Sequence, residues 1–251
     1  MPVLTQRSLD SDQGIALIVT LMTMTLILAL GLALTLTTIT ETRIANNLRR
    51  AAQARYAADA MIERVVPELA RVSWDDVLAG VAKSAFTDGA PSGVRILPGG
   101  GHLDLTGTTN LLRCGKNACS AADMVARTDD RPWGANNPVW QPYAYGPLDT
   151  LATSAFDVPI YVIVWVGDDP AENDGDPVHD GAPPSDCDLQ ADPVCADGNA
   201  GNGVIVLVAT AFGADGTQRT VTATVARERN ADGKPVDDHP TADVVSWREG
   251  R

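Results

Sequence analysis

Residues 15–40 read IALIVTLMTMTLILALGLALTLTTIT, a run without a single charged side chain. At about 1.5 Å per helical residue this run is roughly 39 Å long, more than the ~30 Å thickness of a membrane's hydrocarbon core. A secretory signal peptide has a shorter apolar region followed by a small-residue cleavage site, and neither feature is present. We therefore predict a membrane-spanning helix at residues 15–40, preceded by a short polar leader at residues 1–14.

The helical pattern continues after the apolar run, through TETRIANNLRRAAQARYAADAMIERVVPELARV (residues 40–72). Apolar or small side chains recur there at spacings of three and four, which predicts a single stripe on one helix face. The residues of this stripe are Ile44, Leu48, Ala51, Ala52, Ala58, Ile62, Val65, Val66 and Leu69. We expect one continuous helix over residues 15–72, apolar all round at first and amphipathic over residues 41–72.

Composition and cysteine usage narrow the class of protein. The formal net charge of the 251-residue chain is -13, which argues against nucleic acid as a partner because phosphate binding needs Lys and Arg. Four cysteines follow the apolar run: Cys114, Cys119, Cys187 and Cys195. An even number of cysteines in a chain with an export signal favours two disulfides over four free thiols or a zinc site. Three pairings are open, and we prefer the local one, which closes the shortest loops.

The C-terminal third predicts an antiparallel sheet. Residues 157–167 (DVPIYVIVWVG), 203–212 (GVIVLVATAF) and 218–228 (QRTVTATVARE) are rich in β-branched residues, and residues 213–216 supply a hairpin turn. In the third strand the threonines face one way, and Val221, Ala223 and Val225 face the other. Such a sheet can bury the amphipathic helix, which makes the expected class α+β, a long N-terminal helix packed on an antiparallel β-sheet domain.

The rest of the globular region, residues 73–229, is less clear. Residues 94–97 and 103–105 predict two short strands around a glycine-rich turn, and the remainder up to residue 156 resembles loop. The polar tail at residues 230–251 is expected to be loose.

An acidic loop spans residues 168–199 and contains no Lys or Arg. Its first part, DDPAENDGD, carries candidate calcium ligands: Asp168, Asp169, Asn173, Asp174 and Asp176. The loop does not follow the EF-hand pattern, because aligning Gly175 with the turn glycine places Pro170 at the first ligand position. A solvated loop pinned by a disulfide is the plainer interpretation, and a partner-binding surface is a third.

No enzyme motif is present in the chain. The sequence has no GxSxG, HExxH, P-loop or dinucleotide-binding fingerprint. The three histidines, His102, His179 and His239, lie in polar stretches typical of solvated loops. We therefore predict a structural protein and no catalytic residues.

Residues 13–63 resemble the N-terminal segment of PilX-type minor pilins in the type IV pilin superfamily. The resemblance is carried by Gly14 before the apolar run, by the Thr-rich exit from it, and by ETRIANNL (residues 41–48) and AADA (residues 57–60). It implies that a prepilin peptidase cuts after Gly14 and that the new amine of Ile15 is methylated. It also implies an anchor in the inner membrane that later packs in the filament core.

One position departs from the family pattern. Most pilins carry Glu at the fifth residue of the mature chain, where this sequence has Val19. In the family that carboxylate is thought to pair with the terminal amine of a neighbour already in the filament, and an unpaired buried charge costs several kcal/mol. A subunit without it is better suited to sit first, so the resemblance implies a priming or tip role.

The sequence gives conflicting signals about which side of the membrane holds the globular domain. Arg43, Arg49, Arg50 and Arg55 follow the apolar run, and the positive-inside rule alone would place that side in the cytoplasm. The cysteines favour an oxidising compartment, and the pilin resemblance also places the globular domain in the periplasm. We give the cysteines and the resemblance more weight than the arginines, and we predict that the globular domain lies in the periplasm.

The expected function is that of a minor pilin that primes pilus assembly and presents a PilY-type adhesin at the extracellular tip, supporting adhesion and twitching motility. Its expected partners are other minor pilins, the major pilin, the prepilin peptidase and the inner-membrane assembly platform. Two alternatives remain open. A tip pseudopilin of a type II secretion system shares the anchor but typically inserts a large helical domain. A plain single-pass membrane protein would not be cut at Gly14.

Overall fold

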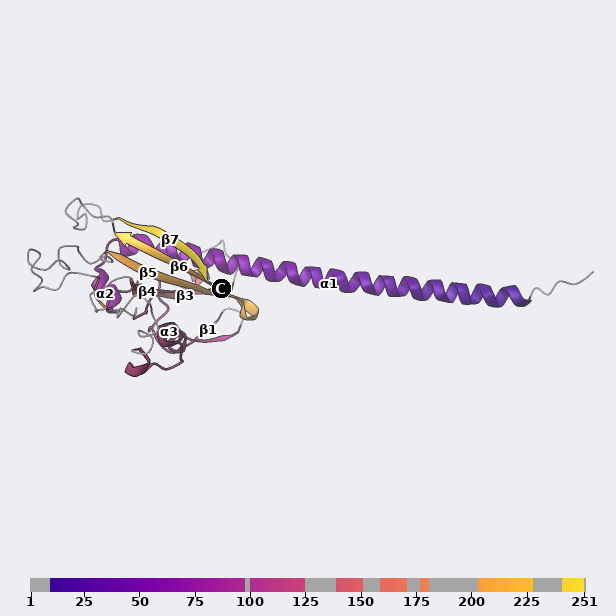
Figure 1. Cartoon of the computed structure of the whole chain (residues 1–251), viewed down its shortest axis with the longest axis horizontal. Helices are drawn as coiled ribbons and strands as arrows, with labels where there is room; N and C mark the ends of the chain where they lie inside the picture. The colour runs from indigo at the N-terminus through magenta and orange to yellow at the C-terminus, as the bar shows by residue number, and fades with distance from the viewer. Residues whose placement is uncertain are drawn as a thin grey trace, which may run out of the picture. The chain divides into compact units, whose positions relative to one another are not determined.

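The computed structural model describes residues 10–97, 100–124, 139–150, 159–170, 177–180, 203–227 and 241–250. Its elements are α1 (Asp10–Leu69), α2 (Trp74–Leu78), β1 (Val94–Ile96), β2 (His102–Asp104), α3 (Leu105–Cys114), β3 (Gln141–Pro147), β4 (Tyr161–Asp168), β5 (Val204–Phe212), β6 (Gln218–Arg227) and β7 (Ala242–Gly250) (Figure 1). Short 3-10 turns lie at Leu148–Thr150 and Ala214–Gly216. The chain divides into two compact units between Arg49 and Arg50.

Helix α1 confirms the prediction of one continuous helix, with shifted ends. It begins within the polar leader, at Asp10, and ends at Leu69 rather than at Val72. Pro67 lies inside the last turn, where a missing N–H removes only one hydrogen bond. The chain then tightens into a turn, in which the Arg71 N–H donates to the Glu68 carbonyl at 3.1 Å.

Two side chains satisfy the carbonyl groups at the end of α1. Trp74 Nε1 donates to the Leu69 carbonyl at 2.9 Å, and the Arg227 guanidinium donates to the same carbonyl at 3.0 Å and to that of Val72. The guanidinium also lies over the Trp74 ring, 4.2 Å from its centroid. A cation is favourable at the negative end of a helix dipole, so Arg227 fixes this end of α1 onto β6.

A five-stranded antiparallel sheet forms the centre of the second unit, in the order β3-β4-β5-β6-β7. Strands β4, β5 and β6 confirm the three strands predicted from the C-terminal third, and the predicted turn joins β5 to β6. Asp215 and Gly216 adopt φ angles of 56° and 73°, a left-handed conformation that Asp and Gly tolerate best. The predicted α+β class, a helix packed on an antiparallel sheet, is confirmed.

The loose tail is a wrong expectation for residues 242–250. Strand β7 pairs with β6 from Arg227 opposite Ala242 to Thr220 opposite Gly250. A polar edge strand has one solvated side, so its composition resembles that of a tail until a neighbouring strand supplies backbone partners.

The region before β4 also contains more structure than expected. The predicted short strands are present as β1 and β2, which pair with Val94 opposite Asp104. Helix α2, helix α3 and strand β3 were not predicted. Helix α3 reads LTGTTNLLRC, in which threonine and glycine have low helix propensity, and it is held instead by the burial of Leu105 and Thr109.

The sheet is buried on both faces at its centre. Every residue of β4 is buried. Val162, Val164 and Val166 pack with residues 54–69 of α1, whereas the alternate residues Tyr161, Ile163 and Trp165 pack with β2, α3 and β5. Figure 1 shows α3 and β1 across the sheet from this part of α1.

Strand β6 confirms the predicted alternation. Val221, Ala223 and Val225 are buried in the core that contains α1, and the threonines between them are only half-buried. Their hydroxyls form cross-strand contacts, with Thr210 and Thr220 Oγ1 atoms 3.0 Å apart and Ser246 Oγ donating to Thr224 Oγ1 at 2.9 Å.

Candidate functional site

The expected processing site lies on α1. Gly14 and Ile15 are both exposed, and the helix passes through the peptide that joins them. Val19 is also exposed, and four residues after Ile15 it lies on the same helix face. The side chain one turn after Ile15 is therefore the isopropyl group of Val19. It can neither accept a hydrogen bond nor neutralise a cation bound near the Ile15 backbone.

The apolar side chains of this segment are exposed and pack against none of the other residues that the structure describes. In the stretch Gly14–Leu69 the most hydrophobic 18-residue window is entirely exposed, and the helix is long and apolar enough to cross a membrane. Ile27 is 68% exposed and Leu28 is 66% exposed. Burying such surface in hydrocarbon is worth about 25 cal/mol per Å², so membrane anchoring fits this region.

The threonines of the anchor, and Thr42 just after it, form hydrogen bonds with their hydroxyl groups inside the helix. Each donates to a carbonyl three or four residues earlier in the same helix, at 2.8–3.0 Å. The residues are Thr20, Thr23, Thr25, Thr35, Thr37, Thr38, Thr40 and Thr42. Hydrocarbon offers no water as a partner, so these internal bonds suit the segment to lipid or to a helix bundle.

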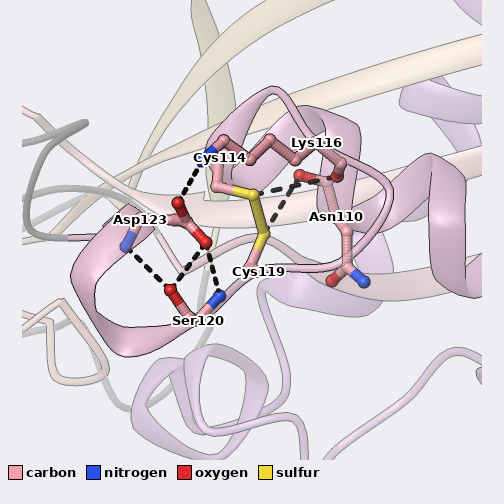
Figure 2. A network of polar contacts seen from close by, with 6 residues as sticks. All are labelled: Asn110, Cys114, Lys116, Cys119, Ser120 and Asp123. Atoms are coloured by element: carbon pink, nitrogen blue, oxygen red, sulfur yellow. Dashed lines mark hydrogen bonds and ion pairs between the residues drawn. A yellow bond between two sulfur atoms is a disulfide. The ribbon is translucent and has the colours of Figure 1, made fainter.

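A disulfide closes the loop after α3 (Figure 2). Cys114 and Cys119 are bonded as the local pairing predicts, with their Cα atoms 5.9 Å apart. Gly115, at φ 76°, ends the helix, and its N–H donates to the Leu111 carbonyl at 3.0 Å. Asn110 Nδ2 donates to the carbonyl of Asn117 at 2.9 Å, which ties the loop back to the helix.

A charged clasp continues from this loop. The Asp123 carboxylate accepts from the Ser120 N–H at 2.9 Å and from the Ser120 hydroxyl at 2.6 Å, and it pairs with the Lys116 ammonium (Figure 2). The Lys116 hydrogen bond, with those from Ser120, holds the pKa of Asp123 well below its usual range. The Asp123 N–H donates back to Ser120 Oγ at 3.2 Å, a reciprocal cap on the helical turn that follows.

The remaining predicted site residues are only partly described. Cys187, Cys195, Asn173, Asp174 and Asp176 lie outside the described residues. Asp168 is buried at the end of β4, with Asp169 next to it. In the described ranges no group of three or more His, Cys, Asp or Glu side chains could hold a metal ion. Calcium binding by this loop and the second disulfide stay predictions.

A groove between α1 and β7 was missed at the sequence level. It has a volume of about 480 Å³ and is lined by Tyr56, Asp59, Ala60, Ile62, Glu63, Val244 and Trp247. Sequence reasoning could not find it, because the tail that carries Val244 and Trp247 has the polar composition of a loose segment. The one signal available was the short β-branched and aromatic run VVSW at residues 244–247.

Comparison with known proteins concerns the anchor. The family model described as PilX N-terminal matches residues 13–63, the apolar run and most of the amphipathic helix that follows. No match to a curated protein or to a solved structure was found. Pilins of this family are structural, non-enzymatic proteins. Residues 13–63 are therefore similar to the N-terminal segment of PilX-type pilins, and this similarity supports a PilX-type pilin.

Proposed function

We propose that this protein is a minor pilin that primes type IV pilus assembly and forms part of the pilus tip complex. One observation carries the proposal: the PilX N-terminal match over residues 13–63 includes an apolar anchor in which Val19 replaces the usual carboxylate. The match supports a pilus-associated membrane protein, and the replacement supports a place at the tip.

The tip position follows from the chemistry of Val19. In the family, an incoming subunit uses a carboxylate to neutralise the terminal amine of the subunit above it. Val19 lies on the same helix face as Ile15 but cannot accept that cation, and an unpaired charge in an apolar core costs several kcal/mol. A subunit with no neighbour above it does not incur this cost.

The rest of the chain is suited to work outside the cytoplasm. A domain stapled by the Cys114–Cys119 disulfide belongs in an oxidising compartment. We place it in the periplasm before assembly and at the extracellular tip afterwards. There it contacts other minor pilins and a PilY-type adhesin, with the major pilin below.

Processing gives the first test. Intact mass and N-terminal sequencing of the membrane-extracted protein, with and without the prepilin peptidase, should show a peptidase-dependent methylated start at Ile15. A Cβ built at Gly14 meets no atom within 4 Å, so Gly14→Leu should leave the helix intact while blocking cleavage. A start at Met1 or Pro2 in cells with active peptidase would contradict the pilin pathway.

A clean deletion gives the second test. It should reduce piliation, adhesion and twitching, and the wild-type gene should restore all three. Normal piliation in the deletion strain, with no redundant paralogue, would refute the priming role. Complementation by Val19→Glu should restore less than the wild type, because the added carboxylate has no amine to pair with at the tip.

A tip pseudopilin of a type II secretion system is the second candidate, because it also lacks the carboxylate. That class typically inserts a large helical domain. In the described part of this chain, α2 has five residues and α3 has ten, and a further helical turn lies at residues 121–124. A deletion that abolishes protein secretion while leaving pili unchanged would favour this candidate over the pilus.

A further inference from the structure

The two edges of the sheet differ in how they are covered. Residues 84–88 lie along β3, where the Ser84 N–H donates to the Tyr143 carbonyl at 3.0 Å and the Tyr145 N–H donates to the Phe86 carbonyl at 2.9 Å. On the opposite edge, no described segment pairs with the outer side of β7. Strand β7 therefore presents backbone donors and acceptors that an added strand can use.

An apolar groove runs beside this open edge. Its lining includes Tyr56 and Ala60 from α1, and Val244 and Trp247 from β7. Tyr56 is 68% exposed and Trp247 is 44% exposed, so two aromatic rings of the same groove are in contact with solvent. Tyr and Trp are enriched among the few residues that dominate the binding energy at protein interfaces.

The groove is held in shape before any partner arrives. Trp247 Nε1 donates to the Asp59 carboxylate at 2.8 Å, and the Arg55 guanidinium lies 5.1 Å from the centroid of the Trp247 ring. Arg55 also pairs with Glu249 at 3.6 Å. A side chain fixed in this way loses little conformational entropy on binding.

The charge of the groove selects its partner. Among the described residues its charged lining side chains are Asp59 and Glu63; Asp59 already pairs with Arg55 at 4.0 Å, so Glu63 carries the negative charge that the groove offers to a partner. Glu63 is exposed at its rim, and the chain as a whole carries a net charge of -13. A Lys or Arg side chain therefore complements this surface, and its aliphatic stem can lie against Tyr56.

We propose that β7 and this groove bind an extended, basic segment of another protein by strand addition. The backbone of the segment pairs with the outer edge of β7. Alternate side chains then face α1, where aliphatic residues contact Trp247 and Val244 and a Lys or Arg reaches Glu63. The inference goes beyond the pilus assignment and does not depend on it.

A second copy of this chain fits the surface less well. Edge-to-edge pairing of two β7 strands would bring a second set of Asp59 and Glu63 carboxylates to the same place. The register shift opposite Thr224 and Val225 leaves Val245 of β7 as an extra residue, a β-bulge of the kind that disfavours long pairing between identical strands. The occupant is therefore a different, basic chain.

The test uses the full chain in neutral detergent micelles and a fluorescent eight-residue peptide of alternating Lys and Val, with a Glu–Val peptide as counterpart. Fluorescence anisotropy should show the Lys–Val peptide binding at least roughly tenfold more tightly, as expected for charge complementarity. Glu63→Gln should weaken the affinity for the Lys–Val peptide roughly fivefold. Val244→Lys and Tyr56→Ala should each weaken it roughly tenfold or more. Asp149→Asn, an equal charge change in the turn that follows β3, should bind like the wild type.

Amide hydrogen exchange supplies the second readout. The amides of β7 should exchange more slowly with the Lys–Val peptide bound, and unchanged exchange would overturn strand addition. Equal affinity for the wild type and all variants would also overturn the proposal, because it would reduce binding to overall charge or to the micelle. A dimer of the wild type that Val244→Lys dissociates would show that a second copy occupies the edge, again against the proposal.

Discussion

Helix α1 uses apolar side chains in two opposite ways along its length. Ile27, in the anchor, is 68% exposed, whereas Ile62, in the part that belongs to the globular unit, is 2% exposed. Both residues are helical and both are isoleucine. The difference teaches that secondary structure does not decide where a side chain is buried; the neighbours that are available decide it.

The two regions also satisfy their polar groups differently. The anchor is self-sufficient, because its threonine hydroxyls bond within the helix. The C-terminal end of α1 depends on residues distant in sequence, above all Arg227, which donates to the Leu69 carbonyl. The first region can therefore be transferred to lipid as a unit, and the second is stable only within its domain.

A charge in the anchor should have the largest effect. Leu28→Lys should raise the free energy of membrane insertion by about 3.5 kcal/mol, the difference between Leu and Lys at a helix centre. The urea midpoint of the globular unit should not change. Insertion into microsomes measures the first quantity, with Leu28→Ala as the control. Unimpaired insertion of the Lys variant would contradict the conclusion that the exposed part of α1 lies in lipid.

A cavity in the part of α1 that packs on the sheet should lower the stability of the globular unit and leave membrane insertion unchanged. Leu69 is fully buried in the core between α1 and the sheet, so Leu69→Ala should lower the free energy of unfolding by about 3 kcal/mol. Membrane insertion should be unchanged. Urea unfolding followed by tryptophan fluorescence measures the loss, and Leu32→Ala, in the exposed anchor, serves as the matched control. Equal losses from both variants would show that the two regions are not independent.

Removing the disulfide should have a smaller effect on the globular unit alone. The Cys114–Cys119 bond closes a loop with a sequence separation of 5, for which chain entropy predicts a loss of about 2 kcal/mol on double substitution by Ser. Urea unfolding of the double variant against the oxidised wild type measures it. A wild type that loses no stability on reduction would contradict a role for this bond.

The smallest effect concerns pH. The pKa of Asp123 is held below its ordinary value, chiefly by Lys116, so the ionised clasp stabilises the fold above a pH of about 4. That contribution should be lost as pH falls below the unfolded-state pKa toward the folded one. Lys116→Met should raise the Asp123 pKa in an NMR titration, whereas Lys83→Met should not. An unchanged pKa in the Lys116 variant would show that Ser120 alone sets it.

The local sequence pattern was sufficient to predict an element where that element's own residues determine its conformation and surroundings. The uncharged run predicted the anchor, the β-branched runs predicted β4 to β6, and the short spacing of Cys114 and Cys119 predicted their pairing. It was insufficient for α3, β3 and β7. Helix α3 contains weak helix formers and depends on contacts such as the hydrogen bond from Trp165 Nε1 to Thr109 Oγ1 at 2.9 Å.

The sequence by itself determined the anchor, the PilX-type segment and the position of Val19, because hydrophobicity, charge and residue identity act there without distant partners. The predicted stripe on α1 is buried from Ala58 to Leu69, whereas Ile44 and Leu48 are exposed, so only the tertiary structure decided where burial begins. It also decided which edge of the described sheet stays open, and that Trp247 meets Asp59 on α1. These last features join residues far apart in the chain. Their energy comes from burial and from paired polar groups, which exist only once the sheet has assembled.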